Sequence, residues 1–163
     1  MTQAHASLNQ SLLDLSFVTP GNAHGNFKDW RGHYTVIYFY PKDDTSGCTQ
    51  EGKDFTELYP KFQAFNAKIY GVSRDSLKAH TNFSCKYNFP FELISDHDQV
   101  LCEYFDVMKQ KSMYGRQYLG VERSTFLIDD QGILRQEWRN VKVPNHAQQV
   151  LDSLKDLIAK NTV

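Results

Sequence analysis

The stretch HYTVIYFY, residues 33–40, decides the fold class. Every residue after the histidine is β-branched or aromatic. A continuous run of this kind is typical of a strand buried on both faces of a sheet, because an exposed face would bring in alternating polar residues. The run therefore predicts an α/β protein with helices on both faces of a central sheet.

Apolar patterns on both sides of this run predict the remaining elements. Residues 41–47 break the strand, and from Phe55 to Phe65 apolar residues recur at three- and four-residue spacing, as on an amphipathic helix. Ser73 or Asp75 is the expected N-cap of the next helix. Strands alternating with helices, followed by a hairpin, predict a mixed central β-sheet. Further strands are expected at residues 68–73, 91–94, 124–128 and 133–138, and further helices at residues 75–87, 99–105 and after Pro144.

Length and composition bound the class of protein. With 163 residues, 40% of them hydrophobic, the chain is expected to form one domain, residues 1–163, in which residues 1–30 are irregular. Eighteen Lys and Arg against nineteen Asp and Glu give a net charge of −1, which offers no support for nucleic acid as a partner. No apolar run approaches the roughly 20 residues of a membrane span, and no targeting segment is recognisable. A soluble cytoplasmic protein is expected.

The cysteine and histidine content excludes several kinds of site. The chain has three cysteines, Cys48, Cys85 and Cys102, an odd and low count for a secreted disulfide framework. It has no C-x-x-C pair, so neither a zinc ribbon nor a thioredoxin-type dithiol is encoded. No metal-ligand spacing and no flavin, haem or nucleotide motif is recognisable. Any redox chemistry is therefore expected to need thiols alone, without a cofactor or metal.

Cys48 lies where the buried strand gives way to a helix. Thr45 or Ser46 is a natural N-cap, which places Cys48 in the first helical turn. Free backbone N–H groups and the helix dipole favour a thiolate there, and the thiolate is the nucleophilic form of cysteine. Glu51 opposes this, so a cation from elsewhere is needed, and Arg123 is the candidate. These features alone leave open that Cys48 is an inert residue at a helix start.

Residues 38–55, YFYPKDDTSGCTQEGKDF, resemble the active-site segment of the peroxiredoxin Q family, also called bacterioferritin comigratory protein. The peroxiredoxin pattern of Pro, three residues, Thr or Ser, two residues and Cys is met by Pro41, Thr45 and Cys48. The segments FELISDHDQVLCEYF, SMYGRQYLGVERSTFLIDDQG and VKVPNHAQQVLDSLK follow in the family's order, so the resemblance covers residues 30–160. Ser46 stands where the family usually has proline, and the usual N-terminal strand motif is not recognisable.

The resemblance implies a thioredoxin-like fold and a thiol peroxidase of antioxidant defence. Cys48 would be the peroxidatic cysteine, whose thiolate attacks hydrogen peroxide or an organic hydroperoxide and becomes a sulfenic acid. Arg123 would stabilise the thiolate and bind the peroxide oxygens, Thr45 would hold the attacked oxygen, and Pro41 would shield the thiolate from water. Taken alone, Arg123 could also be a surface ion-pair residue, Thr45 only a cap and Pro41 only a strand terminator. Glu51 would be either a member of the loop network or a solvated acid.

The resemblance also bears on the cysteine that resolves the sulfenic acid. Some family members carry it five residues after the first cysteine, where this chain has Lys53. On the helix expected at residues 75–87, Cys85 falls nearly opposite the apolar face. Another family subgroup resolves through a cysteine in this helix, which implies a Cys48–Cys85 disulfide and local unwinding on oxidation. A tolerated surface cysteine is the alternative for Cys85, and Cys102, among apolar residues, is expected in the core.

Within the family reading, thioredoxin is the expected reductant and a monomer the expected state. Three other functions stay open. The chain could be a one-cysteine peroxidase recycled by a small thiol or glutaredoxin, a redox sensor that passes oxidation to a partner protein, or a thioredoxin-like binding domain with inert cysteines.

Overall fold

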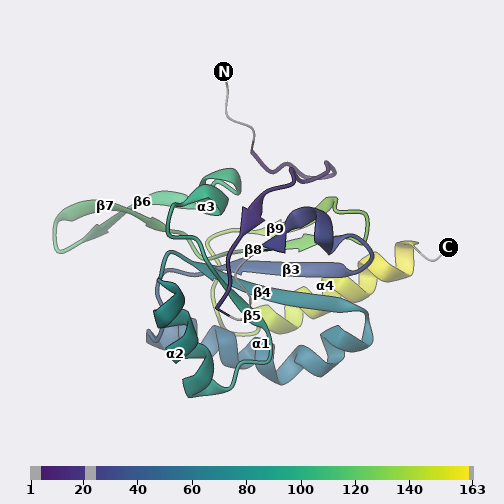
Figure 1. The fold of residues 1–163 in the computed structure, drawn as a ribbon, viewed down its shortest axis with the longest axis horizontal. Helices are drawn as coiled ribbons and strands as arrows, with labels where there is room; N and C mark the ends of the chain where they lie inside the picture. The colour runs from purple at the N-terminus through teal and green to yellow at the C-terminus, as the bar shows by residue number, and fades with distance from the viewer. Residues whose placement is uncertain (1–4, 21–24, 162–163) are drawn as a thin grey trace.

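The computed structural model describes residues 5–20 and 25–161, which form a central mixed β-sheet with helices on both faces (Figure 1). The strand order is β5-β4-β3-β8-β9. The strands β3, β4 and β5 pair in parallel, and β8 and β9 continue the sheet with antiparallel pairs. The predicted mixed, partly parallel sheet is therefore confirmed. The five strands are β3 (Tyr34–Phe39), β4 (Ala67–Ser73), β5 (Glu92–Ser95), β8 (Ser124–Ile128) and β9 (Leu134–Trp138).

The central strand is β3, and all six of its residues are buried. Val36 and Tyr38 belong to the core on one face of the sheet, and Ile37 and Phe39 belong to the core on the other. Because side chains alternate along a strand, burial of successive residues requires cover on both faces. The prediction of a strand buried on both faces of the sheet is thus confirmed.

Helices supply that cover. The lower face in Figure 1 carries α1 (Ser46–Ala64), α2 (Leu77–Tyr87) and α4 (His146–Asn161), and the upper face carries the short α3 (Val100–Tyr104). Phe55 and Phe62 of α1 are fully buried in the core of the lower face. Burial of such a side chain stabilises the fold by about 1.5–3 kcal/mol. The α1 helix, which begins at the Cys48 segment, is therefore firmly held on the sheet.

The N-terminal segment packs on the same face as α3. It contains the two-residue strands β1 (Ser16–Phe17) and β2 (Gly25–Asn26) and a 3-10 helix, η1 (Phe27–Trp30), none of which the sequence pattern predicted. Leu12 and Trp30 are buried, and the Trp30 ring stacks on Tyr70 with centroids 4.9 Å apart. A few large buried side chains hold this segment. Because they are not regularly spaced in the sequence, no helix or strand pattern could be recognised.

A hairpin of β6 (Met108–Met113) and β7 (Arg116–Val121) projects from the body of the fold (Figure 1). The sequence analysis missed it, because both strands are largely exposed and lack a clean apolar alternation. The signal available in the sequence was the pair Tyr114-Gly115. In the structure these two residues form the turn, with φ angles of 53° and 78°. Two successive residues with positive φ are typical of a tight hairpin turn.

The start of α2 also differs from the prediction. Ser76 is the N-cap, and its hydroxyl accepts a hydrogen bond from the backbone N–H of Ala79 at 3.1 Å. The prediction of Ser73 or Asp75 as the cap was wrong, because these two side chains bind each other at the end of β4.

Among the described helices, none is long and apolar enough to cross a membrane.

Candidate active site

Cys48 lies in the first turn of α1, close to the end of β3. Thr45 is the N-cap residue, and its carbonyl oxygen accepts the N–H of Thr49 at 2.8 Å. The Cys48 side chain is only 2% exposed and belongs to the core on the α1 side of the sheet. The shielded sulfur therefore lies at a helix start, where the first backbone N–H groups have no partner within the helix and the helix dipole is positive.

Arg123 approaches this sulfur from the segment between β7 and β8. Its Nη2 donates to Cys48 Sγ at 3.5 Å, and its Nη1 donates to Glu51 Oε1 at 2.7 Å. A Cβ atom at Gly47 would lie 3.1 Å from Nη2, so the glycine leaves room for the guanidinium. Arg123 thus supplies the cation that the sequence analysis required beside Cys48.

Glu51 is a buried part of this group and not a solvated acid, since it is 1% exposed. Its Oε2 has no hydrogen-bond partner in the part of the chain that the structure describes. Burial raises the pKa of Glu51 to about 7, against the opposing effect of Arg123. Burial also works to lower the pKa of Arg123, but Glu51 and Cys48 together raise it. The guanidinium therefore stays charged beside both groups.

Thr45 and Pro41 shape the loop before Cys48. Thr45 is exposed, and its hydroxyl donates to the Lys42 carbonyl oxygen at 2.8 Å instead of capping α1. The lone pairs of this hydroxyl are not used in that bond, and its contact with a peroxide stays a prediction. Pro41 lies two residues after the end of β3 and is partly buried. Its shielding role stays a prediction as well.

Cys85 lies on the solvent side of α2, as its helical phase predicted. The sulfur-bearing side chain is exposed, whereas Phe83 on the opposite side of the helix is buried. The next two residues, Lys86 and Tyr87, each bind the carboxylate of Asp44 at 2.8 Å. The end of α2 is therefore attached to the loop that leads into Cys48.

The end of α2 also packs on α1. Phe89 lies so close that a Cβ atom at Gly52 would come within 2.5 Å of its ring, so a larger residue at position 52 would displace it. The ammonium of Lys53 lies 5.1 Å from the centroid of the Tyr87 ring. The segments that carry Cys48 and Cys85 are thus neighbours in space, although they belong to different helices.

Cys102 is confirmed as a core residue. It is fully buried in α3, and its backbone N–H donates to Asp96 Oδ2 at 2.8 Å. Burial raises the pKa of the Cys102 thiol far above its ordinary value, and the charge of Asp96 adds to this effect. The thiol is therefore held in its unreactive form.

A second polar group near Cys48 escaped the sequence analysis. His80 in α2 binds Asp43, five positions before Cys48, at 2.7 Å. The sequence carried no signal for this pair beyond a histidine and an aspartate in separate elements, since 37 positions separate them.

The comparisons with known proteins agree with this arrangement. The model of the AhpC/TSA family matches residues 12–137. Peroxiredoxin Bcp from Xanthomonas campestris is 52% identical over 155 residues, which are 95% of this chain and 97% of that protein. A solved mutant of Xanthomonas campestris Peroxiredoxin Q, 52% identical, superposes with a TM-score of 0.86 over 95% of this chain and 99% of that chain. A solved mutant of Xylella fastidiosa PrxQ, 42% identical, gives 0.89 over 96% and 99%.

These neighbours share the thioredoxin-like peroxiredoxin fold, so the predicted fold class is confirmed. The chain therefore belongs to the AhpC/TSA family, and within it to the Bcp/PrxQ peroxiredoxins.

Proposed function

We propose that this peroxiredoxin reduces hydrogen peroxide and organic hydroperoxides at Cys48 and resolves the oxidised sulfur with Cys85. The observation that carries the proposal is the 3.5 Å contact between Arg123 Nη2 and the buried Cys48 sulfur. A solved complex of Xanthomonas campestris bacterioferritin comigratory protein, 51% identical to this chain, is described in terms of alkyl peroxide reduction and a trapped intermediate. That description supports organic hydroperoxides as substrates here.

The first step is an attack of the Cys48 thiolate on the outer oxygen of the hydroperoxide. An S–O bond forms while the O–O bond breaks, and the sulfur gives two electrons to the peroxide. The leaving alkoxide takes up a proton and departs as alcohol, or as water when the substrate is hydrogen peroxide. Arg123 stabilises the thiolate before the attack and the developing oxygen charge during it. Thr45 and the Cys48 N–H orient the peroxide, and Pro41 keeps water from the sulfur.

The second step forms a Cys48–Cys85 disulfide. The Cys85 thiolate attacks the Cys48 sulfur and displaces hydroxide, which leaves as water after protonation. A disulfide tolerates little more than about 7 Å between Cα atoms, and Cys48 is buried while Cys85 is exposed. The first turn of α1 and the last turns of α2 therefore unwind locally on oxidation. The exposure of Cys85 favours this route over a one-cysteine peroxidase.

The disulfide returns to two thiols by exchange with an external dithiol, for which thioredoxin is the proposed partner. The protein works as a monomer in the cytoplasm, and its chemistry needs only thiols.

Peroxide consumption coupled to thioredoxin and its reductase tests this function. Wild type is expected to turn over, Cys48→Ser to lose all activity, and Cys85→Ser to react once and then stop. Full turnover of Cys85→Ser with thioredoxin would replace the proposal with the one-cysteine mechanism. Full turnover of Cys48→Ser would refute it.

A further inference from the structure

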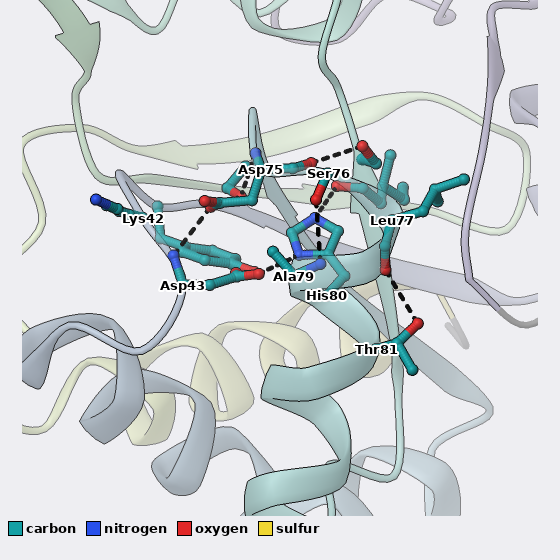
Figure 2. Close-up of polar contacts among 12 residues, drawn as sticks. Lys42, Asp43, Asp75, Ser76, Leu77, Ala79, His80 and Thr81 are labelled. Carbon is teal, nitrogen blue, oxygen red and sulfur yellow. Dashed lines mark hydrogen bonds and ion pairs between the residues drawn. The ribbon is translucent and has the colours of Figure 1, made fainter.

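A buried set of hydrogen bonds joins the loop before Cys48 to the helix that carries Cys85 (Figure 2). His80, in α2, is fully buried. Its Nδ1 lies 2.7 Å from Asp43 Oδ2, and its Nε2 lies 2.9 Å from the carbonyl oxygen of Ile94 in β5. One imidazole thus contacts the Cys48 loop, the Cys85 helix and the sheet.

The contact between His80 and Asp43 needs a shared proton. A carbonyl oxygen can only accept, so the bond to Ile94 requires a hydrogen on Nε2. Nδ1 and the Asp43 carboxylate then hold one further proton between them, whichever atom carries it. Without that proton, two acceptors would face each other at 2.7 Å in buried surroundings, which is strongly unfavourable. We call this contact the inner link.

Neighbouring groups fix Asp43 in place. The Tyr40 hydroxyl donates to Asp43 Oδ1 at 2.7 Å, and the Asp43 N–H donates to Asp75 Oδ2 at 2.9 Å. The Tyr40 ring also lies 6.4 Å from the His80 ring. The titratable groups around the inner link are therefore Tyr40, directly after β3, Asp43 in the loop, and Asp75, two residues after β4. From β5 the imidazole meets the carbonyl oxygen of Ile94.

The next residue in the loop, Asp44, makes a second contact with α2, which we call the outer link. Its partners are Lys86 and Tyr87 at the end of the helix. Asp44 and Lys86 are exposed, so water and salt weaken their ion pair, and Tyr87 is half-buried. Cys85 lies between the inner link at His80 and the outer link at Lys86. The two links therefore hold the helix on either side of the cysteine, one in the core and one in solvent.

We propose that His80 is a positioning residue, which through the inner link holds the Cys48 loop in its peroxide-reactive conformation and fixes the start of α2 while Cys85 moves. The proposal rests on the proposed roles of Cys48 and Cys85. On oxidation the outer link breaks. Unwinding stops at the inner link, because breaking that link would leave buried polar groups without partners.

Isosteric variants separate the two contacts of His80. His80→Gln places an amide N–H where Nε2 lies, keeps the bond to Ile94 and loses the inner link. His80→Asn keeps a donor toward Asp43 and loses the bond to Ile94. Asp43→Asn replaces the shared proton with an amide donor toward the imidazole and keeps an acceptor for Tyr40. Asp44→Asn weakens only the outer link and is the matched control.

Hydrogen exchange of the reduced proteins, without peroxide, tests the inner link independently of what the cysteines do. His80→Gln is expected to raise exchange at residues 41–48 and 74–81 and to slow the reaction of Cys48 with hydrogen peroxide by about tenfold, the effect of about 1.4 kcal/mol. His80→Asn is expected to have a smaller effect on the hydrogen exchange and on the rate with hydrogen peroxide. Asp44→Asn is expected to change neither. Asp43→Asn, which keeps a hydrogen bond to the imidazole, is expected to have a smaller effect than His80→Gln on both the exchange and the rate.

Wild-type exchange and a wild-type rate in His80→Gln would overturn the proposal. If His80→Gln does not fold, hydrogen exchange of the reduced and oxidised wild-type protein tests the proposal instead. On oxidation, exchange is expected to rise at residues 45–52 and 82–88 but not at residues 74–81, and an equal rise in all three segments would overturn the proposal. Peroxidase activity in Cys48→Ser would instead refute the proposed function and leave the reduced-state exchange result standing.

Discussion

The guanidinium of Arg123 lies 3.5 Å from the sulfur of Cys48, although 75 positions separate the two residues in sequence. The same guanidinium binds Glu51 at 2.7 Å. One cation therefore faces a thiol and a carboxylate that are both buried. The guanidinium that contacts the Cys48 sulfur is thus shared with Glu51.

Removing the charge of Arg123 should slow the reaction with peroxide. Arg123→Met keeps a long side chain without charge, and the rate constant for hydrogen peroxide is expected to fall by about 10²–10³, the usual effect of losing one donor to a developing oxyanion. Arg123→Lys keeps the charge but loses the paired N–H groups, so an intermediate rate is expected. Stopped-flow kinetics measures both. A wild-type rate in Arg123→Met would show that the contact has no part in the chemistry.

The burial of Glu51 should make stability fall as pH rises. Its pKa is raised from 4.5 to about 7. Between these values the folded state keeps a proton that the unfolded state has released, so the free energy of unfolding decreases as pH rises through this range. The loss is expected to reach up to about 3 kcal/mol. Urea unfolding at several pH values should show this decrease in wild type relative to Glu51→Gln, which cannot titrate.

His146, at the start of α4, should have the opposite effect. Its Nε2 lies 2.7 Å from Thr125 Oγ1, and burial, with a smaller contribution from Arg123, lowers its pKa from 6.5 to about 4. The unfolded state takes up this proton first, so stability falls as pH drops through that range, by up to about 3 kcal/mol. His146→Gln keeps a polar group near Thr125 and removes the titration.

The Glu51 and His146 effects overlap between pH 4.5 and 6.5 and oppose each other. In that range stability is expected to rise with pH in Glu51→Gln and to fall with pH in His146→Gln, with wild type flatter than either. The same slope in all three proteins would contradict both assignments.

Cys85 and Cys102 should differ sharply in reactivity. Cys85 is exposed and Cys102 fully buried, so brief alkylation of the folded, reduced protein is expected to label Cys85 and leave Cys102 unlabelled until the protein unfolds. Cys102→Ala should keep peroxidase activity and lose about 1 kcal/mol of stability. Mass spectrometry of the labelled peptides measures the first effect. Equal labelling of the two thiols would contradict the core position of Cys102.

The features that the sequence predicted are those that burial or capping shows as a pattern among residues close together in the chain. The run at residues 33–40 showed a strand covered on both faces, and the helical phase of Cys85 showed its exposure. The turn-formers before Cys48 showed a helix start, where Thr45 does lie at the N-cap position. In each case the signal is local, because periodicity and capping depend on residues within a few positions of one another.

Contacts between distant polar residues left no such signal. The bond between Asp43 and His80 spans 37 positions, and nothing in either segment alone points to the other. Arg123 was assigned from the family resemblance, and its bond to Glu51 appears only when α1 and the segment before β8 are brought together. The β6–β7 hairpin was missed because an exposed two-stranded ribbon needs no apolar alternation.

The central claim is the intramolecular disulfide between Cys48 and Cys85. Its most direct test is non-reducing peptide mass mapping after one equivalent of hydrogen peroxide, on wild type, Cys85→Ser and Cys102→Ser. A Cys48–Cys85 linkage is expected in wild type and in Cys102→Ser, and no such linkage in Cys85→Ser. A Cys48–Cys102 linkage, or a sulfenic or sulfinic Cys48 in wild type without any disulfide, would contradict it.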